Sequence, residues 1–155
     1  MKILITGGNG FVGSQLLATL ASKTEHTLCA SVRHDLESTG SVDTYVREVR
    51  HNTDWSDLLV GQEAVIHLAA RAHSTSDTSR SSIDDYQNVN VRGTLNLARQ
   101  AAEAGVCRFL FISSIGVNGN TNLAPFTESD APNPAEFFAQ FKWEAELGLW
   151  EVQGK

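Results

Sequence analysis

Clustered positive charge, paired cysteines and metal-ligand spacings are all missing from this sequence. The 12 Lys and Arg residues are outnumbered by 18 Asp and Glu residues, which gives a formal net charge of −6. Nucleic-acid phosphates are held by clustered Lys and Arg, so this balance argues against a nucleic-acid partner. The two cysteines, Cys29 and Cys107, show no C-x-x-C spacing. We therefore expect two buried free thiols in a reducing cytoplasm, and no metal site.

Long apolar runs are also missing. No stretch approaches the roughly 18 apolar residues that a membrane-spanning helix needs, and no basic segment with a cleavage site opens the chain. A cytoplasmic protein without a membrane partner is expected. The length of 155 residues predicts one domain, residues 1–155, which is short for an enzyme with a separate substrate region.

The most informative stretch is KILITGGNGFVGSQLL, residues 2–17. Its apolar start predicts a buried strand, and Gly7, Gly10 and Gly13, spaced by three, predict a turn that opens a helix. Such a turn needs a residue that tolerates positive φ, a bare backbone at Gly10 admits a pyrophosphate, and Gly13 lets the helix settle on the strand. The N–H groups at the start of that helix attract phosphate. The pattern therefore predicts a dinucleotide-binding α/β fold.

The T-G-G-N-G-F-V-G segment, residues 6–13, resembles the T-G-x-x-G-x-x-G turn of the extended short-chain dehydrogenase/reductases. That family includes nucleotide-sugar epimerases and dehydratases. The resemblance implies that the cofactor is bound by Gly7, Asn9, Gly10, Phe11, Val12 and Gly13. The helix that follows is expected to bury one face, formed by Val12, Leu16, Leu17 and Leu20.

A second buried strand is predicted over residues 27–32, which completes a β-α-β unit. The end of this strand should reach the adenosine ribose, where an acidic residue accepts from the ribose hydroxyls and an arginine favours a 2′-phosphate. Arg33 follows the strand and favours NADP over NAD. Asp35, two residues further on, keeps NAD open as the alternative.

A surface connection over residues 36–44 and a short third strand over residues 45–49 come next, before a helix over residues 55–60. In the family an acidic residue near the end of the third strand contacts the adenine. By position Glu48 matches that residue, and Asp54 is the rival.

The next buried strand, residues 64–70, ends in H-L-A-A and resembles the segment that runs beneath the cofactor in extended family members. Leu68, Ala69 and Ala70 are therefore expected to contact the cofactor, because small side chains let the chain pass close to a flat dinucleotide. His67 is expected to be a packed, hydrogen-bonded histidine rather than a catalytic base.

A long helical pattern covers residues 83–104, after a loop in which Arg71 and His73 can meet a ligand phosphate. Within it, N-V-R-G-T at residues 90–94 resembles the N-V-x-G-T element of the family. A polar residue among apolar partners needs a hydrogen-bonding reason to be there. Asn90 is therefore expected to order the site.

A fifth strand is predicted over residues 108–114, and the S-S-I-G-V-N-G that ends it resembles the serine-bearing strand end of the family. The match places the catalytic serine at Ser114, where its hydroxyl would hydrogen-bond the substrate oxygen during hydride transfer. The alternative is that Ser113 and Ser114 only cap the strand.

The family's catalytic helix begins with Tyr-x-x-x-Lys, a spacing that puts both side chains on one helical face. Here F-F-A-Q-F-K-W-E-A-E, residues 137–146, matches the lysine with Lys142 and the tyrosine with Phe138. The resemblance implies that Lys142 holds the cofactor ribose. A phenyl ring has no acid–base capacity, so the proton-transfer step is expected to be badly impaired.

Together these patterns predict a Rossmann-type, doubly wound α/β fold in three layers, with a parallel sheet of order 3-2-1-4-5 and the cofactor at the switch point between the first and fourth strands. The resemblance implies an NAD(P)-binding domain like that of UDP-glucose 4-epimerases and related dehydratases and 4-reductases, with a nucleotide-sugar substrate. The substrate region that follows in the family is not expected in this chain. A non-catalytic NAD(P)-binding or sensing module is the alternative, and an open fifth-strand edge suggests a homodimer.

Overall fold

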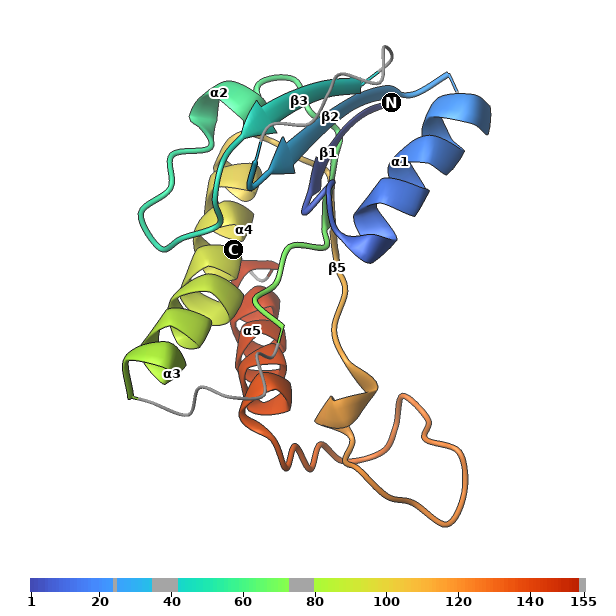
Figure 1. Ribbon diagram of the computed structural model, residues 1–155, viewed down its shortest axis with the longest axis vertical. Coiled ribbons are helices and arrows are strands. Elements are labelled where there is room, and N and C mark those ends of the chain that lie inside the picture. The colour runs from blue at the N-terminus through green and yellow to red at the C-terminus, as the bar shows by residue number, and fades with distance from the viewer. Residues whose placement is uncertain (24, 35–41, 73–79, 154–155) are drawn as a thin grey trace.

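A computed structural model describes residues 1–23, 25–34, 42–72 and 80–153 of the chain. Its five described strands form one parallel sheet in the order β3-β2-β1-β4-β5 (Figure 1). The predicted fold class and strand order are thereby confirmed. The strands are β1 Lys2–Thr6, β2 Thr27–Val32, β3 Val42–Val46, β4 Ala64–His67 and β5 Arg108–Phe111.

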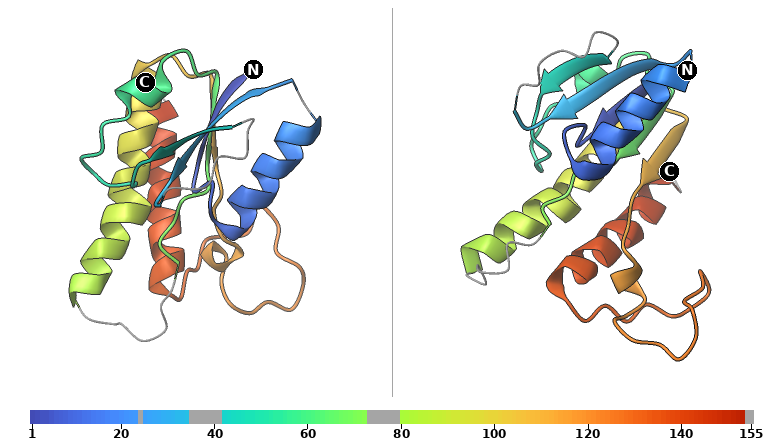
Figure 2. Two further views of the ribbon diagram at one scale, coloured as in Figure 1. Left: turned by 45° about the horizontal axis from the view of Figure 1, so that its top comes forward. Right: turned by 45° about the vertical axis from the view of Figure 1, so that its right-hand side comes forward.

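Helices cover both faces of the sheet. Figure 2 shows α1 on one face, with α4 and α5 on the opposite face. The α-helices are α1 Phe11–Lys23, α2 Ser56–Leu59, α3 Arg80–Gln87, α4 Thr94–Glu103 and α5 Phe137–Gln153, and two shorter helical segments are the π-helix η1 Asn88–Gly93 and the 3-10 helix η2 Ile115–Val117. None of the helices within the described ranges is both long and apolar enough to cross a membrane.

Each face of the sheet has its own apolar core, because alternate residues of a strand point to opposite sides. On the α1 side, Ile3 and Ile5 pack with Leu17 of the helix. On the α4 side, Leu4 packs with Trp55 and Leu97. The central strands are therefore nearly continuous apolar runs, as expected for a parallel sheet that is covered on both faces.

Three strands differ from their predicted bounds. The third strand spans residues 42–46 rather than 45–49, because its parallel register with β2 starts at the pair Leu28 and Val42. Pairing with a neighbouring strand overrides the turn-like composition of that stretch. Strands β4 and β5 each end three residues early, because their chains leave the ladder at the carboxyl edge of the sheet.

The long predicted helix is interrupted. It begins at Arg80 rather than at residue 83, and residues 88–93 form a π segment between α3 and α4. Gly93 ends this segment at a close approach: a Cβ there would lie 2.8 Å from Val49 Cγ1 and 3.1 Å from the Arg50 nitrogen. The glycine therefore lets the helix pack tightly against residues 49–50. π segments are frequent at functional sites.

Two burial predictions were wrong. Cys29 is buried, and desolvation followed by the charge of Asp43 raises the pKa of its thiol to about 11, but Cys107 is exposed. Cys107 lies in the connection before β5, outside both cores. Val12 is 55% exposed and Phe11 is 95% exposed, because the first turn of α1 projects beyond the apolar surface of the sheet.

Candidate functional site

The glycine turn after β1 is tied tightly to the neighbouring strand. The N–H groups of Gly7 and Gly8 both donate to the carbonyl oxygen of Ser31, at 3.0 and 3.1 Å. Gly7 has φ 74°, and a Cβ there would lie 2.8 Å from the Ala69 nitrogen. At Gly13 a Cβ would lie 2.1 Å from the Gly7 carbonyl oxygen. Neither position can hold a side chain without moving backbone.

The middle glycine differs from the other two. A Cβ at Gly10 would meet only the Gly7 carbonyl oxygen, at 3.2 Å, and the residue is exposed. Its bare backbone therefore faces open space rather than a packed neighbour. This is the arrangement that admits a phosphate next to the N–H groups at the start of α1.

A pocket opens at the carboxyl ends of β1, β2 and β4, at the point where the strand order reverses. Ligands of doubly wound sheets bind at such a switch point. Many of its lining residues are ones that the sequence analysis selected: Gly7, Asn9, Gly10, Arg33, Glu48, Leu68, Ala69, Ala70 and Arg71. The residues that the sequence analysis missed are Ser31, Val32, Arg47, Val49, Arg50 and Val89.

Some predicted cofactor contacts lie outside this lining. Phe11 and Val12 are exposed at the start of α1, and Gly13 is buried beneath the turn. Asn90 and Lys142 are both buried: Asn90 contacts the backbone of Arg71, which lines the pocket, and Lys142 contacts the backbone of Ile112, after β5 and outside the lining. Asp35 and His73, which the sequence analysis also considered, fall outside the described residues.

Four arginines, Arg33, Arg47, Arg50 and Arg71, line the pocket. Arg47 is bound by the carboxylate of Asp57, and this hydrogen bond holds the pKa of Asp57 below its ordinary value. Arg50 Nε donates to Glu48 Oε2 at 3.0 Å. Arg71 Nη1 lies 3.6 Å from a carboxylate oxygen of Asp85. Arg33 lines the same pocket, and it makes no salt bridge with any residue that the structure describes.

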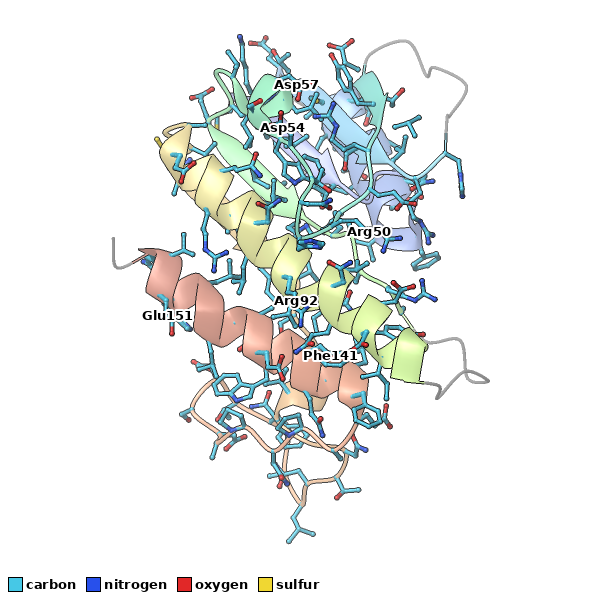
Figure 3. All side chains as sticks on the ribbon, turned by 90° about the vertical axis from the view of Figure 1, so that its left-hand side faces the viewer. Arg50, Asp54, Asp57, Arg92, Phe141 and Glu151 are labelled. Carbon is cyan, nitrogen blue, oxygen red and sulfur yellow. The ribbon has the colours of Figure 1, made fainter. Side chains whose placement is uncertain are left out.

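Glu48 and Asp54, the two acidic residues considered for the adenine contact, lie in different places in the fold. Glu48 lines the pocket, beside Arg50. Asp54 accepts from the Ser56 N–H at 2.9 Å and lies toward α2, apart from Arg50 (Figure 3). No sequence motif marked Arg47 or Arg50, and the predicted third strand over residues 45–49 placed Arg47 inside a strand rather than at the pocket.

Asn90 clamps the segment that forms the pocket wall beyond β4. Its side chain is 1% exposed. Its Oδ1 accepts from the Arg71 N–H at 2.8 Å, and its Nδ2 donates to the Arg71 carbonyl at 3.0 Å. This two-point contact holds the backbone of Arg71, a pocket-lining residue, against η1.

His67 is a fully buried, hydrogen-bonded residue, as predicted. Its Nδ1 lies 2.6 Å from Thr6 Oγ1 and its Nε2 lies 2.9 Å from Thr94 Oγ1. Burial, and then the charge of Lys142, lower the pKa of His67 from 6.5 to about 3. The imidazole is therefore neutral at physiological pH.

This histidine makes the fold sensitive to acid. Between pH 6.5 and about 3 the unfolded chain binds a proton at His67 that the folded chain does not, so stability falls as the pH drops through this window. We expect the free energy of unfolding to lose up to about 1.4 kcal/mol per pH unit from this group. Urea unfolding of the wild type and of His67→Gln from pH 7 to pH 4 measures it. A difference between the two that does not change with pH would contradict the prediction.

The second part of the site lies at the end of β5. Lys142 is 4% exposed, and its Nζ donates to the Ile112 carbonyl at 2.8 Å. The ammonium lies 4.4 Å from the centroid of the Phe111 ring and 5.7 Å from that of Phe138. We call the surroundings of Lys142 at the end of β5 the β5 corner. The Ile112 N–H donates to the His67 carbonyl at 3.3 Å, which joins this corner to the end of β4.

Ser114 caps the short helix η2. Its Oγ accepts from the Gly116 N–H at 3.2 Å. A hydroxyl has one proton to donate besides its acceptor sites, so this bond leaves the Ser114 proton for another partner. The capping role and the substrate-orienting role are therefore compatible.

Phe138 occupies the position one turn before Lys142 on α5. The predicted spacing is confirmed in space, since the ammonium lies near the face of this ring. A phenyl ring can neither donate nor accept a proton. The corner therefore has a cation and a serine hydroxyl but lacks the acid–base group that the family pattern has at this position.

The buried charge of Lys142 costs stability. Desolvation lowers its pKa from 10.5 to about 8, and Glu146 opposes the shift. We expect Lys142→Met to raise the free energy of unfolding at pH 7 by about 2 kcal/mol, because relief of desolvation exceeds the lost hydrogen bond. The gain should shrink between pH 8 and 10.5, where the folded wild type has already lost the proton. Urea unfolding at pH 7 and pH 10 tests this, with Lys23→Met on the surface as control.

Comparison with known proteins points to one family. The sequence profile of the NAD dependent epimerase/dehydratase family matches residues 3–154. A UDP-glucose 4-epimerase of Vibrio cholerae is 39% identical over 150 residues, which are 96% of this chain and 46% of that protein.

Solved structures of similar fold support the same family. MoeE5 in complex with UDP-glucuronic acid and NAD superimposes with a TM-score of 0.86 at 28% identity, over 100% of this chain and 50% of that one. A short-chain dehydrogenase/reductase superfamily protein from Agrobacterium tumefaciens with bound NAD gives a TM-score of 0.83 at 28% identity, over 99% of this chain and 45% of that one. The chain therefore spans about half the length of these relatives.

Proposed function

Because this chain belongs to the NAD-dependent epimerase/dehydratase family, we propose that it is the NAD(P)-binding domain of a protein that acts on nucleotide sugars. One observation carries the proposal: the glycine turn opens on a pocket at the switch point of the sheet, with Ala69 and Ala70 as its wall. The bare backbone at Gly10 and the crowded backbone at Gly7 and Gly13 fit a bound pyrophosphate.

The proposed binding and reacting residues lie in two places, the pocket and the end of β5. In the pocket, backbone N–H groups of the turn bind phosphate, and Leu68, Ala69 and Ala70 lie against the flat part of the dinucleotide. At the end of β5, Lys142 has two N–H groups beyond its bond to Ile112 with which to hold the ribose. Ser114 orients the substrate oxygen. When bound, the nicotinamide supplies hydride transfer at a sugar carbon.

Phe138 limits this chemistry. Positioned general acid–base groups contribute about two to four orders of magnitude to a rate. At Phe138 the group that the family pattern uses to take or return the proton of a sugar hydroxyl is missing, so turnover is badly reduced. The same residue favours a second function, a module that binds or senses NAD(P) without turnover.

The preference between NAD and NADP depends on Arg33, which follows β2. Arg33 lines the pocket with no salt bridge within the described ranges, and a guanidinium there suits a 2′-phosphate. The similar solved structures named above contain NAD. We therefore propose that the chain accepts both forms and that Arg33 strengthens binding of NADP.

Fluorescence titration of the purified chain with NADH and NADPH tests the proposal directly. Saturable binding of either supports it, and Arg33→Gln should weaken NADPH more than NADH. The exposed Arg99→Gln on α4 is the matched control, because it removes the same charge away from the pocket. Binding of neither cofactor would contradict the proposed function.

Among the described strands β5 lies at the edge of the sheet, and this edge suggests self-association. Leu110 and Ile112 are 46% and 49% exposed beside this edge, and unpaired edges invite pairing. We propose a homodimer that pairs through β5. Size-exclusion chromatography with light scattering tests it, and a clean monomer at high concentration would contradict it.

A further inference from the structure

A single chain of hydrogen bonds runs through the buried side of the pocket wall. It starts at the Ala69 N–H, 3.3 Å from Thr6 Oγ1, passes through His67, and ends at the Asn90 carbonyl, 2.9 Å from Thr94 Oγ1. It links residues from β1, β4, η1 and α4. Three separate stretches of the sequence supply these residues, namely Thr6, the pair His67 and Ala69, and the pair Asn90 and Thr94.

The direction of the chain is fixed by its two ends. A carbonyl only accepts, so the Thr94 hydroxyl must donate to Asn90. Thr94 Oγ1 can then only accept from His67, which places the imidazole proton on Nε2. The neutral ring is left with a lone pair on Nδ1, and this accepts from the Thr6 hydroxyl.

The hydrogen bonds that hold the pocket wall at Ala69 and at Arg71 both depend on this donor-to-acceptor direction. Thr6 Oγ1, having donated to His67, accepts from the Ala69 N–H. At the other end, Thr94 holds the backbone of Asn90 within the π segment, and the Asn90 side chain binds both backbone groups of Arg71. Residues 69 and 71 are therefore held from opposite ends of one chain that passes through His67.

We propose that His67, held as the Nε2–H tautomer, is a positioning residue that fixes residues 69–71 at the distance the dinucleotide requires. The cofactor part of this inference rests on the proposed function. The geometry also explains why a histidine lies at the end of β4, where the proposed chemistry does not use it. Asparagine or serine could not span from Thr6 to Thr94, because neither carries two ring nitrogens on opposite sides.

The wild-type protein gives the first test. A nitrogen-15 NMR spectrum of labelled histidine at pH 7 should show His67 as the neutral Nε2–H tautomer, with an imidazole proton protected from exchange. A Nδ1–H tautomer or a charged ring would overturn the proposal. This measurement requires no variant to fold and no cofactor to bind.

Thr94→Val gives the second test, since it removes the hydroxyl and keeps the shape. We expect amide exchange at Ala69 and Arg71 to accelerate about tenfold or more relative to Ala30 in β2, and NADH affinity to fall about tenfold. Thr94→Ser should restore both. Thr19→Val is the matched control, because Thr19 makes the same type of bond, to the Gln15 carbonyl at 2.8 Å, in α1.

The outcomes separate the two proposals. Failure of the wild type to bind NADH would contradict the proposed function, while the tautomer and the exchange rates would still decide the role of His67. If Thr94→Val leaves exchange at Ala69 and Arg71 unchanged, or accelerates it equally at Ala30, His67 has no positioning role.

Discussion

Replacing Phe138 with tyrosine is expected to raise turnover of UDP-glucose with NAD by about two to four orders of magnitude over the wild type. The added hydroxyl would extend from a ring that already lies beside the Lys142 ammonium, 5.7 Å from its centroid. A nearby positive charge favours the phenolate, so the pKa of the new phenol should fall below its ordinary value of about 10. Ultraviolet titration of the phenol and single-turnover reduction of NAD measure the two effects.

Phe137→Tyr is the matched control for this experiment. Phe137 is the preceding aromatic residue of α5 and is 54% exposed, so its hydroxyl would face solvent rather than Lys142. A gain with Phe138→Tyr alone supports a degenerate enzyme. If Phe138→Tyr binds NADH tightly but gains no turnover, the chain is a binding or sensing module instead.

Alanine substitutions at Gly13 and Gly10 are expected to separate stability from cofactor binding. At Gly13 the new Cβ would lie 2.1 Å from the Gly7 carbonyl oxygen and 3.0 Å from the Gly8 Cα, which are backbone atoms that cannot rotate away. We expect a loss of about 3 kcal/mol or more in the free energy of unfolding. For a chain of this size, the melting temperature should fall by about 10 °C.

Gly10→Ala should leave stability nearly unchanged and weaken cofactor binding. Its Cβ would meet only one atom, at 3.2 Å, and the position is exposed, so the free energy of unfolding should change by less than about 0.5 kcal/mol. The methyl group would instead stand where a pyrophosphate approaches the backbone. NADH affinity should fall about tenfold or more, because close hydrogen bonds to the phosphates are lost.

Thermal melts and NADH titrations of both variants give a two-by-two comparison. Equal NADH affinity in Gly10→Ala and the wild type would show that the phosphates do not lie against this turn. An unchanged melting temperature in Gly13→Ala would show that the turn is looser than its contacts indicate.

The fold was predictable because its signals are local. The apolar run of β1, the glycine spacing and the helix that follows are determined within residues 2–17, and the family match over residues 3–154 confirms the resemblance that this stretch suggested. Alternation of buried strands and helices then leaves few arrangements, since parallel crossovers are right-handed. Where the local signal was weak, at the third strand, the predicted boundary was wrong.

The site was only partly predictable. Gly7, Gly10, Ala69 and Ala70 were selected as small residues at motif positions, and they line the pocket. Arg47 was missed because it carries no motif. Phe11 and Val12 were selected by proximity in the motif, yet their side chains are exposed at the start of α1, outside the pocket lining.

By itself the sequence determined the strand order, the backbone turn that can accept a phosphate and the absence of a hydroxyl at Phe138, because each depends on residue type at a short spacing. Only the tertiary structure decided which distant side chains share the switch point. Thr6, His67 and Thr94 lie 61 and 27 positions apart along the chain, and they meet because parallel pairing brings the carboxyl ends of β1 and β4 together beneath α4. The strand order alone does not give these contacts: the register of the two strands and the packing of α4 on the sheet are set by burial across the whole sheet, and short sequence patterns do not encode them.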